Sequence, residues 1–300
     1  MNDEHLTESR RYLISRSADE RMVICGADFW IPMPRYDKYF KVIHKMLSRE
    51  GQHQAQCALF SSRYGGGKTA FLLQLMEIYQ FRPQKLKTIL MDQNLDKFRL
   101  LDLICEAFDV RSWGRGAAGS RSAMIMRAIR NGNYRAIVVD ELHDALHESQ
   151  RTLMQNLSLL KHMCGGKFKL NILAFGDHKA SEIIAADGQV GRRFAQFALP
   201  GWSCDDEFKE FVTSYVAHLP LQLPSPDVMN RDFLIKLYKL SNGIMDNFVK
   251  FLKAASEVAI ETGEERITTA QLKDFSEIIL TCGYALQLPE PKGKTPRHGN

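Results

Sequence analysis

Residues 57–69 read Cys-Ala-Leu-Phe-Ser-Ser-Arg-Tyr-Gly-Gly-Gly-Lys-Thr. A short apolar run is followed by three glycines, a lysine and a threonine, and a helical pattern begins at once. Glycines permit the tight turn that points successive backbone N–H groups inward, and the start of a helix favours an anion. The pattern predicts a phosphate-binding loop in which Lys68 reaches the β- and γ-phosphates of a nucleotide and Thr69 binds Mg²⁺.

The predicted loop starts at Ser62, where the usual pattern has glycine. A glycine-rich turn that binds nothing is the alternative, but the strand before the loop and the helix after it favour a phosphate site. The residues predicted to touch the nucleotide are Tyr64, Gly65, Gly66, Gly67, Lys68, Thr69 and Ala70.

A second motif is Ala136-Ile137-Val138-Val139-Asp140-Glu141, an apolar run that ends in two carboxylates. Asp140 is predicted to hold Mg²⁺ through water, and Glu141 to orient or deprotonate the attacking water. The alternative is that the pair only caps the next helix. Together the two motifs predict a P-loop NTPase, an enzyme that hydrolyses ATP, with ATP and Mg²⁺ as cofactors.

Composition is that of an ordinary globular protein: 300 residues, 45% hydrophobic, 25% charged and a net charge of +5. Mild basicity permits an anionic partner such as nucleic acid without requiring one. The six cysteines form no CxxC pair, which fits a reducing cytoplasm. The charged start of the chain does not match a signal peptide, and no apolar run is long enough to cross a membrane.

Apolar runs alternate with helical patterns up to about residue 200, which predicts an α/β fold with a parallel five-stranded sheet flanked by helices. Beyond Trp202 the pattern is helical, which predicts a small C-terminal domain. We predict four parts: a polar N-terminal segment at 1–22, an α/β domain at 23–201, a helical domain at 202–283 and a disordered, basic, proline-rich tail at 284–300.

Three further sets of residues are considered for nucleotide sensing, catalysis or metal binding. Asp177 follows an apolar strand and is a candidate for sensing the γ-phosphate, although a turn residue explains it equally well. Arg192 and Arg193 are candidates for an arginine finger that reaches a neighbouring subunit's nucleotide. His143 and His147 are four residues apart, but the spacing lacks the glutamate of a metalloprotease motif, so surface or packing roles are favoured.

Candidate DNA contacts are less sharply marked. Flexible, glycine-rich segments with interspersed arginines suit contacts with phosphates. The residues predicted to bind DNA are Lys97, Arg99, Arg115 and Arg121.

The order of features resembles the TniB/TnsC family of AAA+ ATPases, regulators of transposition that include those of CRISPR-associated transposons. The resemblance covers about residues 25–280. The phosphate loop and the Asp-Glu strand occur in many NTPases. More specific are the strap Trp30-Ile31-Pro32, the string Asp140-Glu141-Leu142-His143, the strand end Phe175-Gly176-Asp177, and Arg193-Phe194 leading to Leu199-Pro200-Gly201-Trp202.

The resemblance implies an AAA+ ATPase with a helical lid that forms rings or helical filaments on double-stranded DNA. Such proteins link a target-selection protein, of the TniQ type, to a transposase, and ATP hydrolysis disassembles them. It also implies that Trp30 and Pro32 lie beside the adenine, and that Arg193 or Arg192 is the finger acting in trans.

Two departures from the family pattern predict slow, switch-like hydrolysis. Asp177 stands where the family commonly has threonine, and no arginine follows Gly243 in the predicted lid. Two other readings remain open. One is an AAA+ ATPase of secretion, partition or signalling that assembles on protein without DNA, and the other is a nucleotide-binding scaffold that does not hydrolyse ATP.

Overall fold

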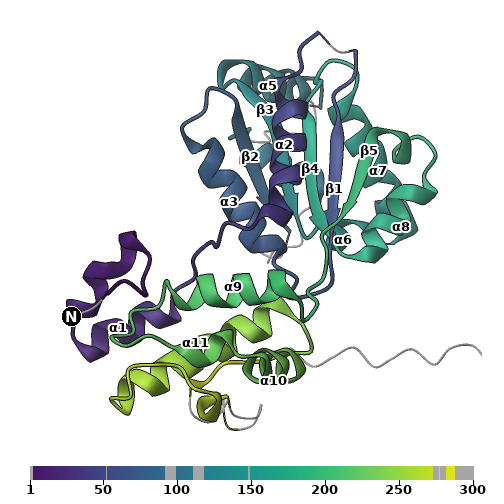
Figure 1. Cartoon of the computed structure of the whole chain (residues 1–300). Helices are drawn as coiled ribbons and strands as arrows, with labels where there is room; N and C mark the ends of the chain where they lie inside the picture. The colour runs from purple at the N-terminus through teal and green to yellow at the C-terminus, as the bar shows by residue number, and fades with distance from the viewer. Residues whose placement is uncertain are drawn as a thin grey trace, which may run out of the picture. The chain divides into compact units, whose positions relative to one another are not determined.

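The computed structural model describes residues 3–51, 53–91, 99–110, 118–147, 149–272, 277 and 282–287, with the backbone alone at 118–120. The chain forms two compact units, labelled by element in Figure 1. One unit comprises residues 32–200. The other combines residues 1–31 with the chain from 201 onward.

Five parallel strands form the sheet of the α/β unit, in the order β2-β3-β4-β1-β5. Successive strands are connected through helices, as parallel pairing requires. The predicted five-stranded parallel sheet is thereby confirmed. The strands are β1 (Cys57–Ser61), β2 (Lys85–Leu90), β3 (Tyr134–Asp140), β4 (Asn171–Gly176) and β5 (Phe194–Ala198).

The helices of this unit cover both sides of the sheet. A short helix directly follows Glu141, and another helix lies between β4 and β5. The helices are α2 (Pro34–Ser48), α3 (Lys68–Gln80), α4 (Leu100–Ala107), α5 (Ala118–Asn131), α6 (Leu142–Leu146), α7 (Gln150–Cys164) and α8 (His178–Ala186).

One side of the sheet has an aromatic core. The ring of Phe60 in β1 stacks on those of Phe175 and Phe197, with centroids 5.3 and 5.2 Å apart. Tyr39 of α2 and Phe71 of α3 pack on Phe60 at 6.1 and 5.6 Å. Helices α2 and α3, in front of the sheet in Figure 1, therefore cover this side.

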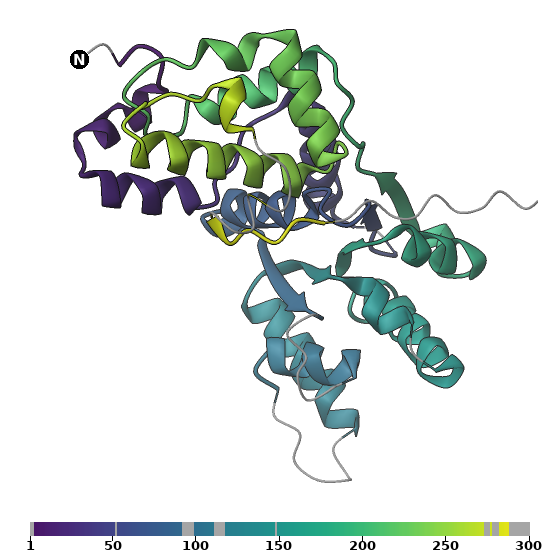
Figure 2. The same cartoon turned by 90° about the horizontal axis from the view of Figure 1, so that it is seen from below.

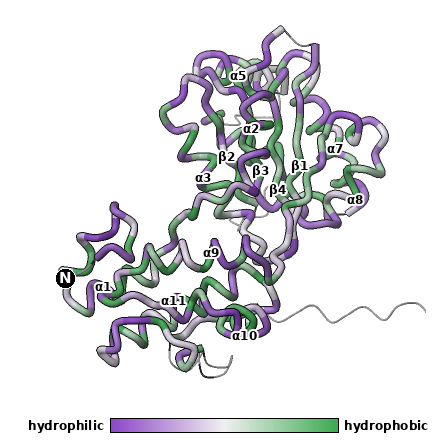
Figure 3. Tube along the Cα trace, viewed as in Figure 1, coloured by the Kyte–Doolittle hydropathy of each residue, from purple (hydrophilic) through white to green (hydrophobic). Residues whose placement is uncertain are grey.

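The opposite side is aliphatic. Leu59, Val139 and Ala174 are fully buried there, in one apolar cluster with residues of α4, α5, α7 and α8. Figure 3 shows the strands as the apolar centre of this unit. Because the central strands are covered on both sides, each is a continuous apolar run and not an alternating one.

The second unit is helical and is built around Trp202. The Trp202 ring lies 4.9 Å from Phe211 and 5.6 Å from Phe248, between centroids. Helix α1 packs along α11 (Figure 2). The elements are the 3₁₀ helix η1 (Glu8–Ser15), α1 (Ala18–Gly26), α9 (Asp206–Val216), η3 (Pro226–Met229), α10 (Arg231–Ser241), α11 (Met245–Glu261) and η4 (Thr269–Gln271).

The N-terminal residues differ from their predicted description as a polar segment separate from the domain starting at residue 23. Leu13 and Ile14 are buried, and Ser17 and Glu20 form a reciprocal capping box that starts α1. Residues up to Ile31 belong to the helical unit. Two buried apolar side chains in a charged stretch are a weak sequence signal, whereas the Ser-x-x-Glu capping pattern is a recognisable one.

Part of the predicted disordered tail is bonded to the helical unit. The Tyr284 hydroxyl donates to Glu257 Oε1 at 2.5 Å, and the Gln287 N–H donates to Asn247 Oδ1 at 2.8 Å. Lys250 Nζ donates to the carbonyl of Ala285 at 2.7 Å. Residues 284–287 are therefore attached to α11, and the remainder of the predicted tail lies outside the described residues.

A buried ion pair joins the N-terminal part of the helical unit to its C-terminal part. Arg21 Nη1 and Nη2 each lie 2.6 Å from a carboxylate oxygen of Glu265. Replacing Glu265 by Gln leaves a buried guanidinium without its counter-charge, and we expect unfolding free energy to fall by about 3 kcal/mol. Urea unfolding measures this. Asp246→Asn, in the more exposed pair with Lys250, should cost under about 1 kcal/mol, and equal losses would contradict the prediction.

Candidate nucleotide-binding site

Three strands end next to one another at one edge of the sheet. β4 lies between β1 and β3, so the chain segments that leave these strands are neighbours. The phosphate-loop sequence follows β1, and Asp140 is the last residue of β3. In open parallel sheets, ligands bind in the crevice outside the carboxyl ends of the strands. The fold therefore brings the two predicted motifs to the edge where a ligand is expected.

The loop between β1 and α3 closes on itself. Ser62 Oγ donates to the carbonyl of Arg63 at 2.9 Å, and the Gly66 N–H donates to the same oxygen at 3.1 Å. Gly65 and Gly67 have φ of 65° and 89°, which glycine adopts without strain. A Cβ at Gly66 would lie 2.6 Å from Ser62 Oγ and 2.9 Å from the Arg63 carbonyl oxygen. Ser62, the departure from the usual pattern, thus helps to close the turn.

Lys68 is the first residue of α3 and is only 5% exposed, while Thr69 is exposed. Lys68 Nζ lies 5.7 Å from the centroid of the Tyr64 ring. The first turn of α3 leaves backbone N–H groups without helical partners, and the helix dipole places partial positive charge there. A glycine cradle with no room for a Cβ, a buried ammonium group and an exposed hydroxyl together fit the phosphates of a nucleotide.

Asp140 and Glu141 turn the chain out of β3. Asp140 is 5% exposed, and its Oδ1 accepts the Glu141 N–H at 3.0 Å. Glu141 has φ 48° and ψ 45°, a left-handed conformation that costs a non-glycine residue about 1–2 kcal/mol. Strained backbone of this kind is retained at functional sites, where the surrounding structure compensates for it. The strain supports a functional role for Glu141 beyond that of a helix cap.

His143 packs against this turn, which its spacing in the sequence does not indicate. It is 7% exposed, and its Nδ1 lies 2.9 Å from Glu141 Oε2. Its ring centroid lies 6.1 Å from that of Tyr64, in an edge-on arrangement. The sequence favours a surface or packing role for His143, and the structure adds that the packing is against the predicted catalytic carboxylate and the loop tyrosine.

The residues present also fit Mg²⁺ bound together with phosphates. Mg²⁺ usually takes one or two protein oxygens and completes its shell with water and substrate phosphates. Thr69 and Asp140 supply ligands of that kind. Within the described ranges, no group of three His, Cys, Asp or Glu side chains could hold a metal ion by itself.

Asp177 has a structural role in the chain as it stands. Its Oδ1 accepts the Ala180 N–H at 2.8 Å, so the carboxylate caps the N-terminus of α8. The preceding Gly176 carbonyl accepts the Ser62 N–H at 3.3 Å, which places the end of β4 against the phosphate loop. The cap accounts for an aspartate at this position, and its sensing role stays a prediction.

Arg192 and Arg193, at the start of β5, differ in their surroundings. Arg193 Nη1 donates to the carbonyl of Lys161, near the C-terminal end of α7, at 2.7 Å. Arg192 is exposed, and its Nε donates to the carbonyl of Gly188 at 2.9 Å. Arg193 is thus a cap of α7 in its own chain, whereas Arg192 presents its guanidinium to the surroundings.

A pair of buried thiols adjoins Arg193. Cys164 Sγ lies 3.5 Å from Arg193 Nη1. A hydrogen bond from Cys57 and the nearby guanidinium lower the pKa of the Cys164 thiol, while the same thiol–thiol hydrogen bond and burial raise that of Cys57. Arg193 is therefore held by a carbonyl and a sulfur at once, which strengthens its assignment as a structural residue.

The remaining predicted site residues are scattered. Trp30 belongs to the helical unit and Pro32 to the α/β unit, so their place beside the adenine stays a prediction. Arg99 is exposed at the N-cap of α4, and Arg121 is partly buried on α5. Lys97 and Arg115 lie outside the described residues.

Solved structures with the same fold include a DNA-bound protein and a domain of a replication initiation protein. Orc1 of Aeropyrum pernix, in complex with DNA, is 16% identical with a TM-score of 0.58, over 80% of this chain and 64% of that one. Domain III of DnaA from Thermotoga maritima is 12% identical with a TM-score of 0.53, over 85% of this chain and 93% of that one. RuvB from Thermotoga maritima is 11% identical with a TM-score of 0.52, over 90% of this chain and 73% of that one.

These neighbours are AAA+ P-loop ATPases, and identities this low show the shared fold alone. The chain covers just under two thirds of the Orc1 chain. No curated protein sequence matches it. The family described as "Bacterial TniB protein" matches residues 21–204, which is more than half of the chain. With the AAA+ fold and the two nucleotide motifs at one sheet edge, the chain belongs to the bacterial TniB family of AAA+ ATPases.

Proposed function

We propose that this protein is an ATP-dependent regulator of DNA transposition. In this proposal it oligomerises into rings or filaments on double-stranded DNA and links a target-selection protein of the TniQ type to a transposase. ATP hydrolysis then disassembles the complex. The membership of the TniB family, together with an intact phosphate loop, is the observation that carries the proposal. An association with CRISPR systems stays a prediction.

The proposal assigns a role to each site residue. The loop glycines, with Tyr64 and Ala70 beside them, and Lys68 bind the phosphates, Thr69 and Asp140 hold Mg²⁺, and Glu141 orients the attacking water. When bound, Mg²⁺ neutralises charge on the phosphates. His143, 2.9 Å from Glu141 Oε2, helps to fix the position of that carboxylate. Trp30 and Pro32 are proposed neighbours of the adenine, and Asp177 a proposed sensor of the γ-phosphate.

Subunit contacts are proposed to complete the site through Arg192. An arginine supplied in trans stabilises the charge that develops during phosphoryl transfer. Arg192 has the exposure this role needs, whereas Arg193 is engaged with α7. The absence of an arginine after Gly243 leaves the lid without one charge that AAA+ lids often provide, which supports slow, switch-like turnover.

The two arginines are separable by mutation. Arg192→Ala should lower ATP turnover by about 10³-fold or more, with ATP affinity and thermal stability nearly unchanged. Arg193→Ala should instead lower the unfolding free energy by about 1–2 kcal/mol, because two α7 contacts are lost. Steady-state phosphate release and thermal unfolding of both variants distinguish these effects. A turnover defect confined to Arg193→Ala would reverse the assignment.

DNA binding is the part of the proposal that separates it from its main alternative, an AAA+ ATPase that assembles on protein. Lys97, Arg99, Arg115 and Arg121 are the proposed contacts.

No helix in the described part of the chain is long and apolar enough to span a membrane. A reducing cytoplasm is the proposed location, in keeping with the free cysteines.

Fluorescence anisotropy with a labelled duplex tests this choice. The proposal expects binding that requires ATP and weakens steeply as salt rises, because counterions are released from the phosphates. Absence of binding in low salt, with ATP present and hydrolysis intact, would favour the alternative that assembles on protein.

A further inference from the structure

A basic groove lies at the opposite edge of the same sheet, among the amino ends of the strands. It precedes β1 at Ala55, β3 at Asn133 and β4 at Lys169, and has a volume of about 490 Å³. The nucleotide motifs are at the carboxyl ends of these strands. The groove therefore cannot belong to the phosphate loop's own site. We call it the amino-edge groove.

Charge in the amino-edge groove is strongly unbalanced. Its charged lining residues are Arg49, Glu50, Arg130, Arg135 and Lys169. The carboxylate of Glu50 forms an ion pair with the Arg135 guanidinium, so these two charges offset each other. Arg49, Arg130 and Lys169 are exposed, and within the described residues none of the three forms an ion pair. Three cations are left facing solvent around one concave surface.

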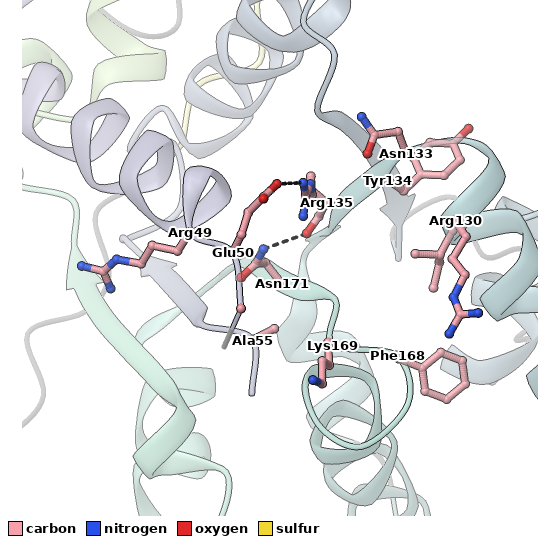
Figure 4. Close-up of a pocket in the computed structure, with 12 residues that line it drawn as sticks. Arg49, Glu50, Ala55, Arg130, Asn133, Tyr134, Arg135, Phe168, Lys169 and Asn171 are labelled. Carbon is pink, nitrogen blue, oxygen red and sulfur yellow. Dashed lines mark hydrogen bonds and ion pairs between the residues drawn. The ribbon is translucent and has the colours of Figure 1, made fainter. Parts of the chain in front are cut away.

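The floor of the groove is polar and is held by hydrogen bonds between strand ends. The Asn171 side chain donates to the Arg135 carbonyl at 2.8 Å and accepts the Gln56 N–H at 3.1 Å, which ties three strand ends together. Figure 4 shows Arg49 and Arg130 on opposite sides of this floor, with Lys169 between them. Lys169 has φ 49°, a strained conformation for a lysine, and the fold retains it there.

The aromatic residues of the groove indicate which anion it suits. Tyr134 packs edge-on against Phe108 at 5.3 Å between centroids, and Phe168 packs against the aliphatic core. Both rings are partly covered by these contacts, so the exposed groups of the groove are mainly its cations and not aromatic faces on which unpaired bases stack. It offers separated cations, which suit a run of phosphates spaced along a backbone.

We propose that the amino-edge groove binds the phosphodiester backbone of duplex DNA through Arg49, Arg130 and Lys169. The inference rests on the proposed function, because it takes DNA as the anionic partner, and it adds a contact surface outside the residues predicted from the sequence. It predicts binding without sequence preference, since phosphates carry no base information.

A local explanation competes with this one. Arg49 directly follows α2 and Arg130 lies in the last turn of α5, where cations stabilise the helix dipole. That explanation covers two of the three cations individually, but not Lys169 or the convergence of all three on one groove. It also makes a different prediction, which is a loss of thermal stability without a change in DNA binding.

The test is a triple variant, R49A/R130A/K169A, measured by anisotropy with a labelled duplex in saturating ATP over a range of salt. Each lost phosphate contact should reduce the slope of log affinity against log salt by about 0.9. Losing three contacts should reduce this slope by about 2.7 for each protomer bound to the DNA. Raising the salt fourfold should therefore cost the wild type about 40-fold more affinity than it costs the variant. ATP affinity should not change.

The matched control is K41A/R151A/K179A, which removes the same charge from exposed positions on α2, α7 and α8. Equal effects of the two variants, or a lowered melting temperature with unchanged DNA binding, would overturn the groove while leaving the proposed function intact. No DNA binding by the wild type would overturn both. Displacement of DNA from the wild type by millimolar inorganic phosphate, at ionic strength matched with chloride, would assign the groove to small anions instead.

Discussion

Replacing Lys68 by Ala is expected to lower ATP affinity by about 10²–10⁴-fold. Charge-assisted hydrogen bonds contribute about 1.5–3 kcal/mol each, and the proposed role of the ammonium group is to make two of them, one to each of the β- and γ-phosphates. The side chain is buried at the start of α3 beside the glycine cradle, so the variant removes the charge from the proposed phosphate site itself. Titration with a fluorescent ATP analogue measures the loss.

The control for this variant is Lys41→Ala, which removes the same charge from an exposed position on α2. Its ATP affinity should match that of the wild type. If Lys68→Ala binds ATP as tightly as the control does, the phosphate site is elsewhere and the assignment of the loop fails.

Replacing Glu141 by Gln is expected to preserve ATP binding and to reduce turnover by about 10²–10⁴-fold, the usual contribution of general-base catalysis. Glutamine keeps the size of the side chain, so the strained turn at φ 48° should persist while the carboxylate is lost. The DNA-bound state should then last longer, because hydrolysis is proposed to end it. Single-turnover phosphate release and DNA dissociation rates measure the two effects.

Glu106→Gln is the matched control, because it makes the same change at an exposed carboxylate on α4. It should leave turnover within about twofold of the wild type, since a solvated carboxylate outside the nucleotide motifs has no contact with the reacting water. Unchanged turnover in Glu141→Gln would show that another group acts as the base.

The sheet and the phosphate loop could be predicted because local chemistry determines them. Three consecutive glycines before Lys68 are compatible with few structures other than a tight turn into a helix. Continuous apolar runs such as Ala136–Val139 require cover on both faces, and hence a parallel sheet between helices. Both signals are contained within a few residues of the chain.

Other features depend on contacts between distant residues, which periodicity does not report. Arg193 is one example, because its partners, Lys161 and Cys164, are about 30 positions away in the chain. The N-terminal 31 residues are another, since Arg21 pairs with Glu265. The amino-edge groove is assembled from segments at the starts of three strands, and single basic residues in a sequence do not reveal such convergence.

Electron microscopy of the protein with linear duplex DNA, with and without nucleotide, tests the central claim that ATP at the phosphate loop holds an assembly on DNA. With ATP and Mg²⁺, Glu141→Gln should form rings or filaments on the duplex, and Lys68→Ala should form none. Regular assemblies that form equally well without nucleotide, or with Lys68→Ala, would contradict the account.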